Sequence, residues 1–384
     1  MKNQIQKHIA RLGLTCIILF LLSISCDKKE QENIPDSGFI KSGQYLGKYY
    51  PTDTWRECTP SEVGMDPDIL NEMGHRIQEL VDQGYPIDGI LVLKDGYIVG
   101  EYYDPEYTGG NVKHVIHSCT KSFTSACMGI AISKGFIAGV DKPVLQYFSE
   151  YSISNFDNQK ELITIEHLLT MSAGLDWNEL DVPYTDPENA FYQWRRSEDH
   201  IQFILDRPME YLPGTVQDYN SGLSDLLSVI IQKSTGVRLD SFAMQYLLSP
   251  IGIDDFYWEI DPDGHALGYG QMQLSPRNMA RFGYLYLNNG AWDGQQLISP
   301  SWIIESGTAQ IQAQHNVGVQ QYGYQFWVSD FGMYTAMGYL GQWIMILPDQ
   351  ELVVVFVNNF TPGDGEQWMT PIYLLQEYII PAVL

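Results

Sequence analysis

Apolar residues recur every three or four positions after Asp66-Pro67, which predicts an amphipathic helix. Asp followed by Pro is a typical helix start, because the carboxylate caps free N–H groups and proline fits the first turn. Two apolar runs follow, at 89–93 and 97–99, separated by Lys94-Asp95-Gly96. Asp-Gly between apolar runs favours a tight turn, so we expect a β-hairpin here. The apolar stripe of the predicted helix comprises Ile69, Leu70, Met73, Ile77 and Leu80.

The middle of the chain, from about 118 to 250, has mainly helical periodicity, and strand patterns return only near the end. We expect one sheet built from distant halves of the chain, with a sheet subdomain at about 51–117 and 266–384 and an all-helical insertion at about 118–265. The fold class is therefore α/β (α+β). The predicted helices are Ile165–Met171, Gly222–Lys233, Asp240–Leu248 and a final one at Trp368–Ile380, and the predicted late strands are Tyr322–Val328, Trp343–Leu347 and Leu352–Val357.

The first 25 residues have the pattern of an export signal. Three basic residues precede an apolar run of 11 residues, 12–22, which is shorter than the roughly 20 residues that span a bilayer. Ser23-Ile24-Ser25-Cys26 then leads into a polar stretch, and this resembles a bacterial lipoprotein signal in which Cys26 is acylated. A plain signal peptide with Cys26 unmodified is the alternative. We expect a tether at 26–50, a body at 51–384, and an exported protein lipid-anchored in the bacterial envelope.

Acidic residues outnumber basic ones, 47 against 22, for a net charge of −25. Removal of residues 1–25, with three basic and no acidic residues, makes it −28. Nucleic-acid binding is disfavoured, because it requires a basic face. Cys58, Cys119 and Cys127 are an odd number in the body, so they cannot form a closed disulfide framework.

Ser118 and Lys121 form a Ser-x-x-Lys pair at the start of an apolar, core-type helix. Positions i and i+3 share a helix face, so the amine can reach the hydroxyl. A serine needs a base next to it to act as a nucleophile, and burial lowers the pKa of a lysine enough for that task. The pair alone is a weak signal, because Ser118 can equally be a helix cap and Lys121 a solvated first-turn residue. A second such pair, Ser25 and Lys28, lies in the export signal and cannot be catalytic.

Two further segments carry candidate chemistry. Tyr219-Asn220-Ser221 precedes a predicted buried helix, so its tyrosine either points into a cleft or packs at the helix entry. Gly338 and Gly341 flank Tyr339 next to a predicted strand, where glycine marks close approach of a ligand or of another chain segment, or a simple bulge.

Together these three segments resemble the boxes of the serine β-lactamase and penicillin-binding-protein superfamily, in the same order. The likeness is greatest to its class C-like esterase and D-aminopeptidase branch and covers about 51–384. The resemblance implies an antiparallel sheet flanked by helices, with the active site between the sheet and a helical subdomain. It also implies acyl transfer by Ser118, with Lys121 and Tyr219 moving the proton and either one serving as the base. The backbone N–H groups of Ser118 and Tyr339, beside Gly338, would bind the oxyanion. Ser221 would form a hydrogen bond with the substrate or with Lys121.

The third box departs from that pattern. Ala336 and Met337 stand where members that act on penicillins or peptide C-termini carry groups that hold a carboxylate. We therefore expect a neutral ester or amide, or a short peptide, as substrate, and poor hydrolysis of β-lactams. We also expect Trp177, Tyr184, Tyr192, Trp194 and Trp343 to line an aromatic pocket or to pack in the core.

Three other functions stay open on the sequence: a penicillin-binding-like sensor that does not turn over, a D-Ala-D-Ala peptidase and a true β-lactamase. The histidines His114, His117, His167 and His200 lack metal-ligand spacing, and no nucleotide-binding loop is present, so we expect neither metal nor cofactor.

Overall fold

The turn at Asp95-Gly96 joins the two long strands β2 (Ile87–Lys94) and β3 (Tyr97–Tyr103) in the computed structural model, which describes residues 36–107, 109–315 and 318–384. Both turn residues have positive φ, 53° and 87°, as a tight hairpin turn requires. The predicted hairpin is therefore confirmed. The export signal at 1–25 and Cys26 lie outside the described residues.

Strands from both ends of the chain form one sheet of nine strands, in the order β1-β3-β2-β14-β13-β12-β11-β10-β9. β14 (Leu352–Asn358) pairs antiparallel with β2, from Leu352 opposite Lys94 to Asn358 opposite Ile87. Every residue of β14 is buried, so both faces of the sheet centre are covered. The remaining strands are β1 (Arg56–Glu57), β9 (Ile311–Gln312), β10 (Gln321–Tyr322), β11 (Trp327–Val328), β12 (Tyr334–Gly338) and β13 (Gln342–Leu347).

The expected strand at 322–328 is instead a hairpin of the two short strands β10 and β11, so that prediction was wrong. Gln325 between them has φ 62° and is buried. Its backbone N–H donates to the Leu169 carbonyl at 3.0 Å, and its side chain donates to the Leu168 carbonyl at 2.9 Å. These bonds draw the chain out of the sheet toward the helical segments, which a strand pattern cannot reveal.

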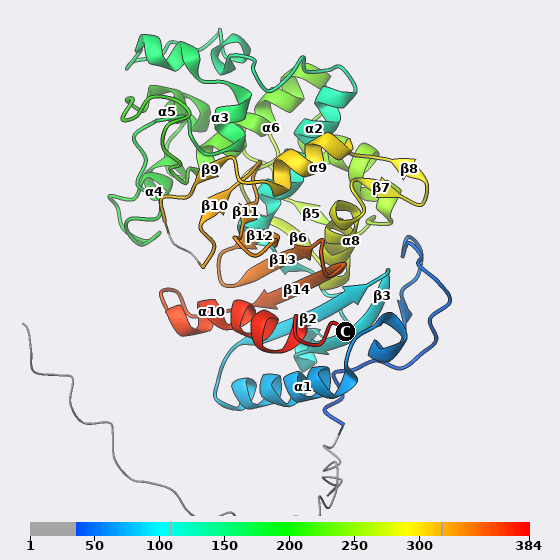
Figure 1. Cartoon of the computed structure of the whole chain (residues 1–384). Helices are drawn as coiled ribbons and strands as arrows, with labels where there is room; N and C mark the ends of the chain where they lie inside the picture. Colours follow the sequence, from blue (N-terminus) through cyan, green and yellow to red (C-terminus); the bar gives the residue numbers. More distant parts are fainter. Residues whose placement is uncertain (1–35, 108, 316–317) are drawn as a thin grey trace, which may run out of the picture. The chain divides into compact units, whose positions relative to one another are not determined.

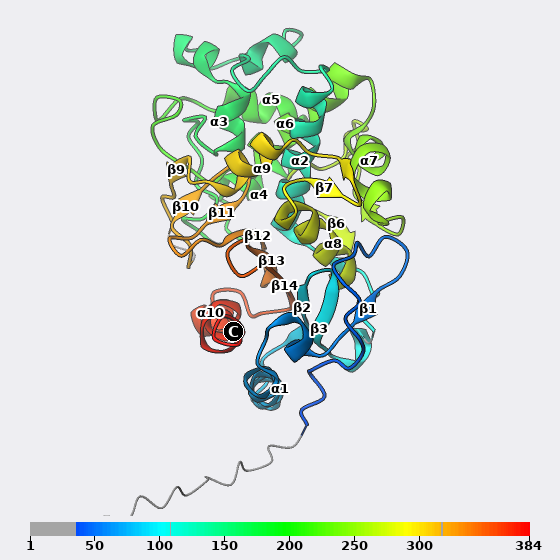
Figure 2. The same cartoon turned by 45° about the vertical axis from the view of Figure 1, so that its right-hand side comes forward.

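Helices cover both faces of the sheet (Figures 1 and 2), as expected for this fold class. α8 (Pro276–Leu287) lies on β13, β14 and β2. Its Gly283 permits this approach, because a Cβ there would lie 2.6 Å from Val353 Cγ1. α1 (Pro67–Asp82), capped by Asp66, and α10 (Gly365–Leu374) lie on the opposite face. α10 continues as a short π-helix, Leu375–Ile379.

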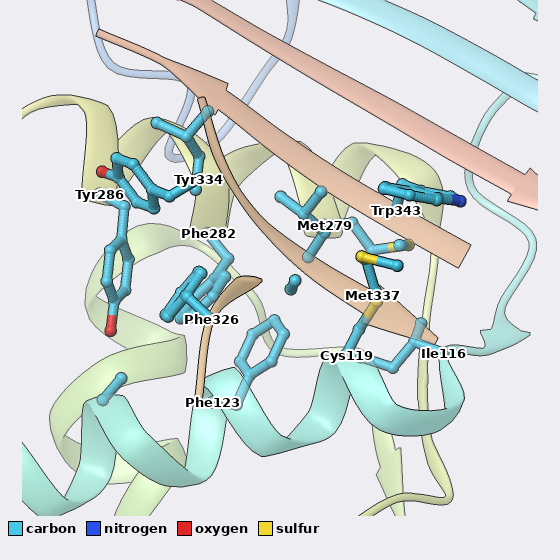
Figure 3. Packing of buried hydrophobic residues seen from close by; sticks show 14 of the residues in the cluster. Ile116, Cys119, Phe123, Met279, Phe282, Tyr286, Phe326, Tyr334, Met337 and Trp343 are labelled. Carbon is cyan, nitrogen blue, oxygen red and sulfur yellow. The ribbon is translucent and has the colours of Figure 1, made fainter. Parts of the chain in front are cut away.

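α2 (Thr120–Ser133) runs through the core behind α8 and connects the sheet to the helical part of the chain. Figure 3 shows its Phe123 against Phe282 of α8, with a distance of 3.7 Å between the ring centroids. Met337 and Trp343 of the sheet lie over the start of the same helix. Cys58, Cys119 and Cys127 are free and buried.

The segment from 134 to 220 is much less helical than its sequence pattern predicts. Its helices are short and joined by long irregular stretches, in which Pro183, Pro187, Pro208 and Pro213 interrupt helix formation. The boundaries of the two predicted subdomains stay a prediction. Besides α8 and α10, the α-helices beyond 134 in the described residues are α3 (Ile165–Leu169), α4 (Ala190–Trp194), α5 (His200–Asp206), α6 (Ser221–Thr235), α7 (Leu239–Ala243) and α9 (Pro300–Gly307).

Two small sheets complete the fold, and their strands are β4 (His114–Val115), β5 (Tyr257–Trp258), β6 (Met272–Leu274), β7 (Ala291–Trp292) and β8 (Gln295–Gln296). Within the described residues, none of the helices combines the length and the apolar character that crossing a bilayer requires.

Candidate active site

Ser118 lies on a short 3-10 turn, His117–Cys119, immediately before α2. It is partly buried, and Cys119 rather than Ser118 occupies the N-cap position of the helix. The turn is wedged against the end of β12, where a Cβ on Gly338 would lie 2.3 Å from the Ile116 carbonyl oxygen. The glycine at 338 therefore admits another chain segment, which holds the Ser118 turn against the sheet.

Lys121 is buried, with 1% of its surface exposed, and its amine contacts three oxygen atoms. Nζ lies 2.9 Å from Ser118 Oγ, 3.0 Å from Ser221 Oγ and 2.8 Å from the Tyr269 carbonyl oxygen. The alternative of a solvated first-turn lysine is thus wrong. The first and second predicted segments meet at this amine.

Burial lowers the pKa of Lys121 to about 8, because a charged amine loses its hydration there. The carboxylates of Glu179 and Asp225 act in the opposite direction and keep the pKa from falling further. A substantial share of the amine is therefore neutral at mildly alkaline pH and has a free lone pair to accept a proton.

Tyr219 lies beside the same amine, with Lys121 Nζ 5.0 Å from the centroid of its ring. The ring stacks on Trp327 of β11 at a centroid distance of 5.8 Å and is 5% exposed. Burial raises the pKa of the Tyr219 phenol well above its ordinary value, although its hydrogen bond with Ser118 acts to lower it. The phenol is therefore protonated at neutral pH and can donate a hydrogen bond or a proton.

Sequence reasoning missed Glu179, a carboxylate with 1% exposure behind Ser221. The Ser221 hydroxyl donates to its Oε1 at 2.6 Å. Tyr184 donates to the same oxygen, while Ser221 N–H and Trp177 Nε1–H donate to Oε2. In the sequence Glu179 is one of two acidic residues in the mixed polar and apolar stretch 175–180, which does not by itself indicate a site.

A pocket of about 390 Å³ opens above Ser118. It lies between the end of β12 and the chain around the start of α10, and Asp364 is the one charged residue among those that line it. Gly338 and Tyr339 lie on its wall, as the third predicted segment requires. The other lining residues are largely apolar or aromatic and include Leu180, Tyr184, Tyr219, Trp327, Met337, Leu340, Phe360 and Trp368.

Only one of the five aromatic residues expected around the pocket lines it, and that is Tyr184. Trp177, Trp194 and Trp343 belong to the buried core instead. Trp343 packs beside Trp368 at a centroid distance of 5.6 Å, and Trp368 is the ring that reaches the pocket. For these three tryptophans, core packing, the alternative that the sequence left open, is therefore the correct one.

The four histidines stay apart from this chemistry. His117 packs edge-on against Tyr339, and burial lowers its pKa to about 4, so its imidazole is neutral. Across the described part of the chain, no three His, Cys, Asp or Glu residues are grouped so as to hold a metal ion.

A serine that contacts a buried, partly neutral lysine, with a phenol beside it and a pocket above, defines a serine hydrolase of the acyl-transfer type. The comparison with known families agrees, since the β-lactamase family model matches residues 74–375. The chain belongs to this family.

The chain is similar in sequence to a known hydrolase and in fold to two solved structures. The 6-aminohexanoate-dimer hydrolase of Paenarthrobacter ureafaciens is 24% identical over 346 residues, which cover 84% of this chain and 86% of that protein. A family VIII carboxylesterase has a similar fold, with a TM-score of 0.60 at 16% identity, covering 81% of this chain and 98% of the other. A penicillin-binding protein homologue from Pyrococcus abyssi also has a similar fold, with a TM-score of 0.61 at 19% identity, covering 81% of this chain and 78% of the other.

The pKa of Lys121 generates a prediction for the reactivity of Ser118. Only the neutral amine accepts a proton, so labelling of Ser118 by a fluorophosphonate should accelerate as pH rises through about 8 and level off above it. Lys121→Met, which keeps the chain length, should lower the plateau by about 10²-fold or more. The measurement is the labelling rate constant between pH 6 and 10. Lys142→Ala, at a more exposed lysine paired with Asp141, is the control and should follow the wild type. A flat profile would contradict the prediction.

Proposed function

We propose that this protein hydrolyses a neutral ester or amide through an acyl-enzyme on Ser118. The observation that carries the proposal is the 2.9 Å contact of Lys121 Nζ with Ser118 Oγ at the floor of a largely apolar pocket. The names of two relatives, a 6-aminohexanoate-dimer hydrolase and a carboxylesterase, are consistent with these bond types.

In the first step, Ser118 Oγ forms a bond to the substrate carbonyl carbon while its proton passes to the Lys121 and Tyr219 pair. The carbonyl oxygen becomes an oxyanion. Backbone N–H groups of Ser118 and Tyr339 stabilise it, in line with their common position on the pocket wall. One such donor contributes about 3–4 kcal/mol to transition-state stability.

In the second step the tetrahedral intermediate collapses, and the bond to the leaving alcohol or amine breaks. The proton held by the pair passes to that leaving group, and the protonated phenol of Tyr219 is suited to deliver it. A water molecule then attacks the acyl-enzyme, gives up its proton through the same pair, and releases the acid while Ser118 regains its hydrogen.

The pocket favours uncharged substrates. Ala336 and Met337 are nearly fully buried and offer no cation for a substrate carboxylate. Asp364 adds a negative charge at the wall, and the chain carries a net charge of −25. Penicillins and peptide C-termini, which are anions, would therefore bind poorly, and chromogenic cephalosporins should be turned over far below enzyme-like rates.

We further propose that the protein acts outside the cytoplasm, anchored to a bacterial membrane through lipid on Cys26. The support is the basic, apolar and small-residue pattern of the first 25 residues, followed by a cysteine and a polar stretch. Several acyl chains, at about 0.8 kcal/mol for each buried CH₂, would hold the protein there.

Replacement of Ser118 tests the hydrolase directly. A fluorophosphonate should label Ser118, and the wild type should release p-nitrophenol from a neutral ester with steady turnover. Ser118→Ala should lose the label and at least about 10³-fold of the turnover. Ser133→Ala, at the other end of α2, is the matched control and should retain both. A single stoichiometric burst without turnover would instead identify a sensor, and absence of labelling would rule out both functions.

The charge of the pocket predicts a preference between two esters of equal length. One is the p-nitrophenyl ester of hexanoic acid, and the other is the p-nitrophenyl monoester of the six-carbon dicarboxylic acid, whose chain ends in a carboxylate. The kcat/KM of the neutral ester should be about 10-fold or more above that of the charged one, because the anion meets Asp364 in a partly desolvated wall. Asp364→Asn should narrow this ratio by about 3- to 10-fold. Asn caps a helix as well as Asp does, so the bonds from Glu366 and Gln367 N–H at the start of α10 should persist. Equal rates for both esters would contradict the substrate proposal.

Lipid attachment is tested by growth with an alkyne-tagged fatty acid. The wild type should incorporate the tag and Cys26→Ser should not, because the thiol is the acceptor. Cys16→Ser changes the other cysteine of the export signal and should leave labelling unchanged. A wild-type protein that is exported without the tag would show that the signal is a plain one.

A further inference from the structure

We propose that Glu179 is a positioning residue, which acts through the Ser221 hydroxyl to direct the lone pair of Lys121 at Ser118. This inference rests on the proposed function. It concerns a buried carboxylate beside the site that the mechanism above does not use.

Glu179 fixes the direction of two hydroxyl groups. A carboxylate oxygen only accepts hydrogen bonds. Ser221 Oγ, at 2.6 Å from Oε1, and Tyr184 OH, at 3.1 Å from the same oxygen, must therefore both donate. The other oxygen, Oε2, receives the Ser221 N–H at 2.8 Å and the Trp177 Nε1–H at 2.9 Å. Four donors satisfy the buried carboxylate.

The consequence reaches Lys121. Because the one hydrogen of the Ser221 hydroxyl points at Glu179, Ser221 can only accept from Lys121 Nζ, which lies 3.0 Å away. The Tyr269 carbonyl, 2.8 Å from Nζ, is also an acceptor only. A neutral amine has two hydrogens and one lone pair. With both hydrogens donated to these acceptors, the lone pair is left facing Ser118 Oγ at 2.9 Å.

A purely structural role for Glu179 is the alternative, since the same bonds tie the chain at 177–184 to the start of α6. Glu179→Gln separates the two roles, because it has the same shape but one acceptor fewer. Trp177 Nε1–H and Ser221 N–H can only donate, so the amide oxygen must take the Oε2 position. The amide NH₂ then faces the Ser221 hydroxyl and donates to it. The hydroxyl hydrogen is displaced toward Lys121 and occupies its lone pair.

Glu179→Gln should therefore lower the pH-independent plateau for Ser118 labelling and for ester hydrolysis by about 10- to 100-fold, a part of what a general base contributes. Loss of the negative charge should at the same time move the acidic limb of the profile to lower pH, because Glu179 raises the pKa of Lys121. A lower plateau together with a shifted acidic limb indicates positioning, because a loss of folded protein would lower the plateau without shifting the limb.

Asp225→Asn is the matched control, because Asp225 also raises the pKa of Lys121 but lies outside the Glu179–Ser221 chain. Its bond from Gly268 N–H, 2.7 Å long, is one that asparagine can keep. This variant should shift the acidic limb and leave the plateau within about 2-fold of the wild type. The same experiment includes Ser221→Ala with and without Glu179→Gln. In the Ser221→Ala background there is no hydroxyl whose hydrogen could turn toward Lys121, so adding Glu179→Gln should change the plateau by less than 2-fold.

Each outcome decides between the roles. An unchanged plateau in Glu179→Gln would overturn the inference. An equal loss in the Ser221→Ala background would also overturn it, and thermal unfolding would then show whether the effect comes from destabilised folding. If wild-type Ser118 neither reacts with the probe nor supports turnover, the proposed function fails and this inference falls with it. If the wild type is active and only the Glu179 result is negative, the inference alone fails.

Discussion

The candidate active site depends on the burial of one amine, that of Lys121. An amine in the protein interior has to find acceptors there, because an unpaired charge or polar group would strongly destabilise the fold. Its three partners are Ser118 from the turn before α2, Ser221 from the start of α6 and the Tyr269 carbonyl from the segment before β6. These elements are far apart in the chain. The amine can serve as a base only when all of them are packed together and water is excluded.

The sheet supplies the fixed frame for this packing. β14 and β2 join the two ends of the chain, and the end of β12 presses on the Ser118 turn where Gly338 leaves room for the Ile116 carbonyl. Figure 3 shows Met337 and Trp343 of the sheet above the start of α2. Ser118 therefore rests on rigid elements, while part of the pocket wall, at 361–364, comes from a loop.

Local patterns predicted local structure well. The Asp95-Gly96 hairpin, the helix after Asp66 and the strand predicted at 352–357 formed as their periodicity and turn residues indicate, the strand being one residue longer than predicted. The pattern failed where a single buried polar group decides the path. Gln325 breaks an expected strand because its bonds to Leu168 and Leu169 outweigh the strand preference of its neighbours. Glu179 went unnoticed, since its link to the site runs through Ser221, which lies 42 positions further along the chain and outside any local window.

By itself, the sequence determined the element order, the candidate serine, lysine and tyrosine, and the absence of a cation from the third box, because these follow from residue identity and spacing. Tertiary structure decided that Lys121 is buried, that Glu179 lies behind Ser221, and which aromatic rings face the pocket. Protonation and hydrogen-bond direction depend on what surrounds a side chain in three dimensions. That environment is assembled from residues 42, 100 and 148 positions apart, so spacing along the chain carries no record of it.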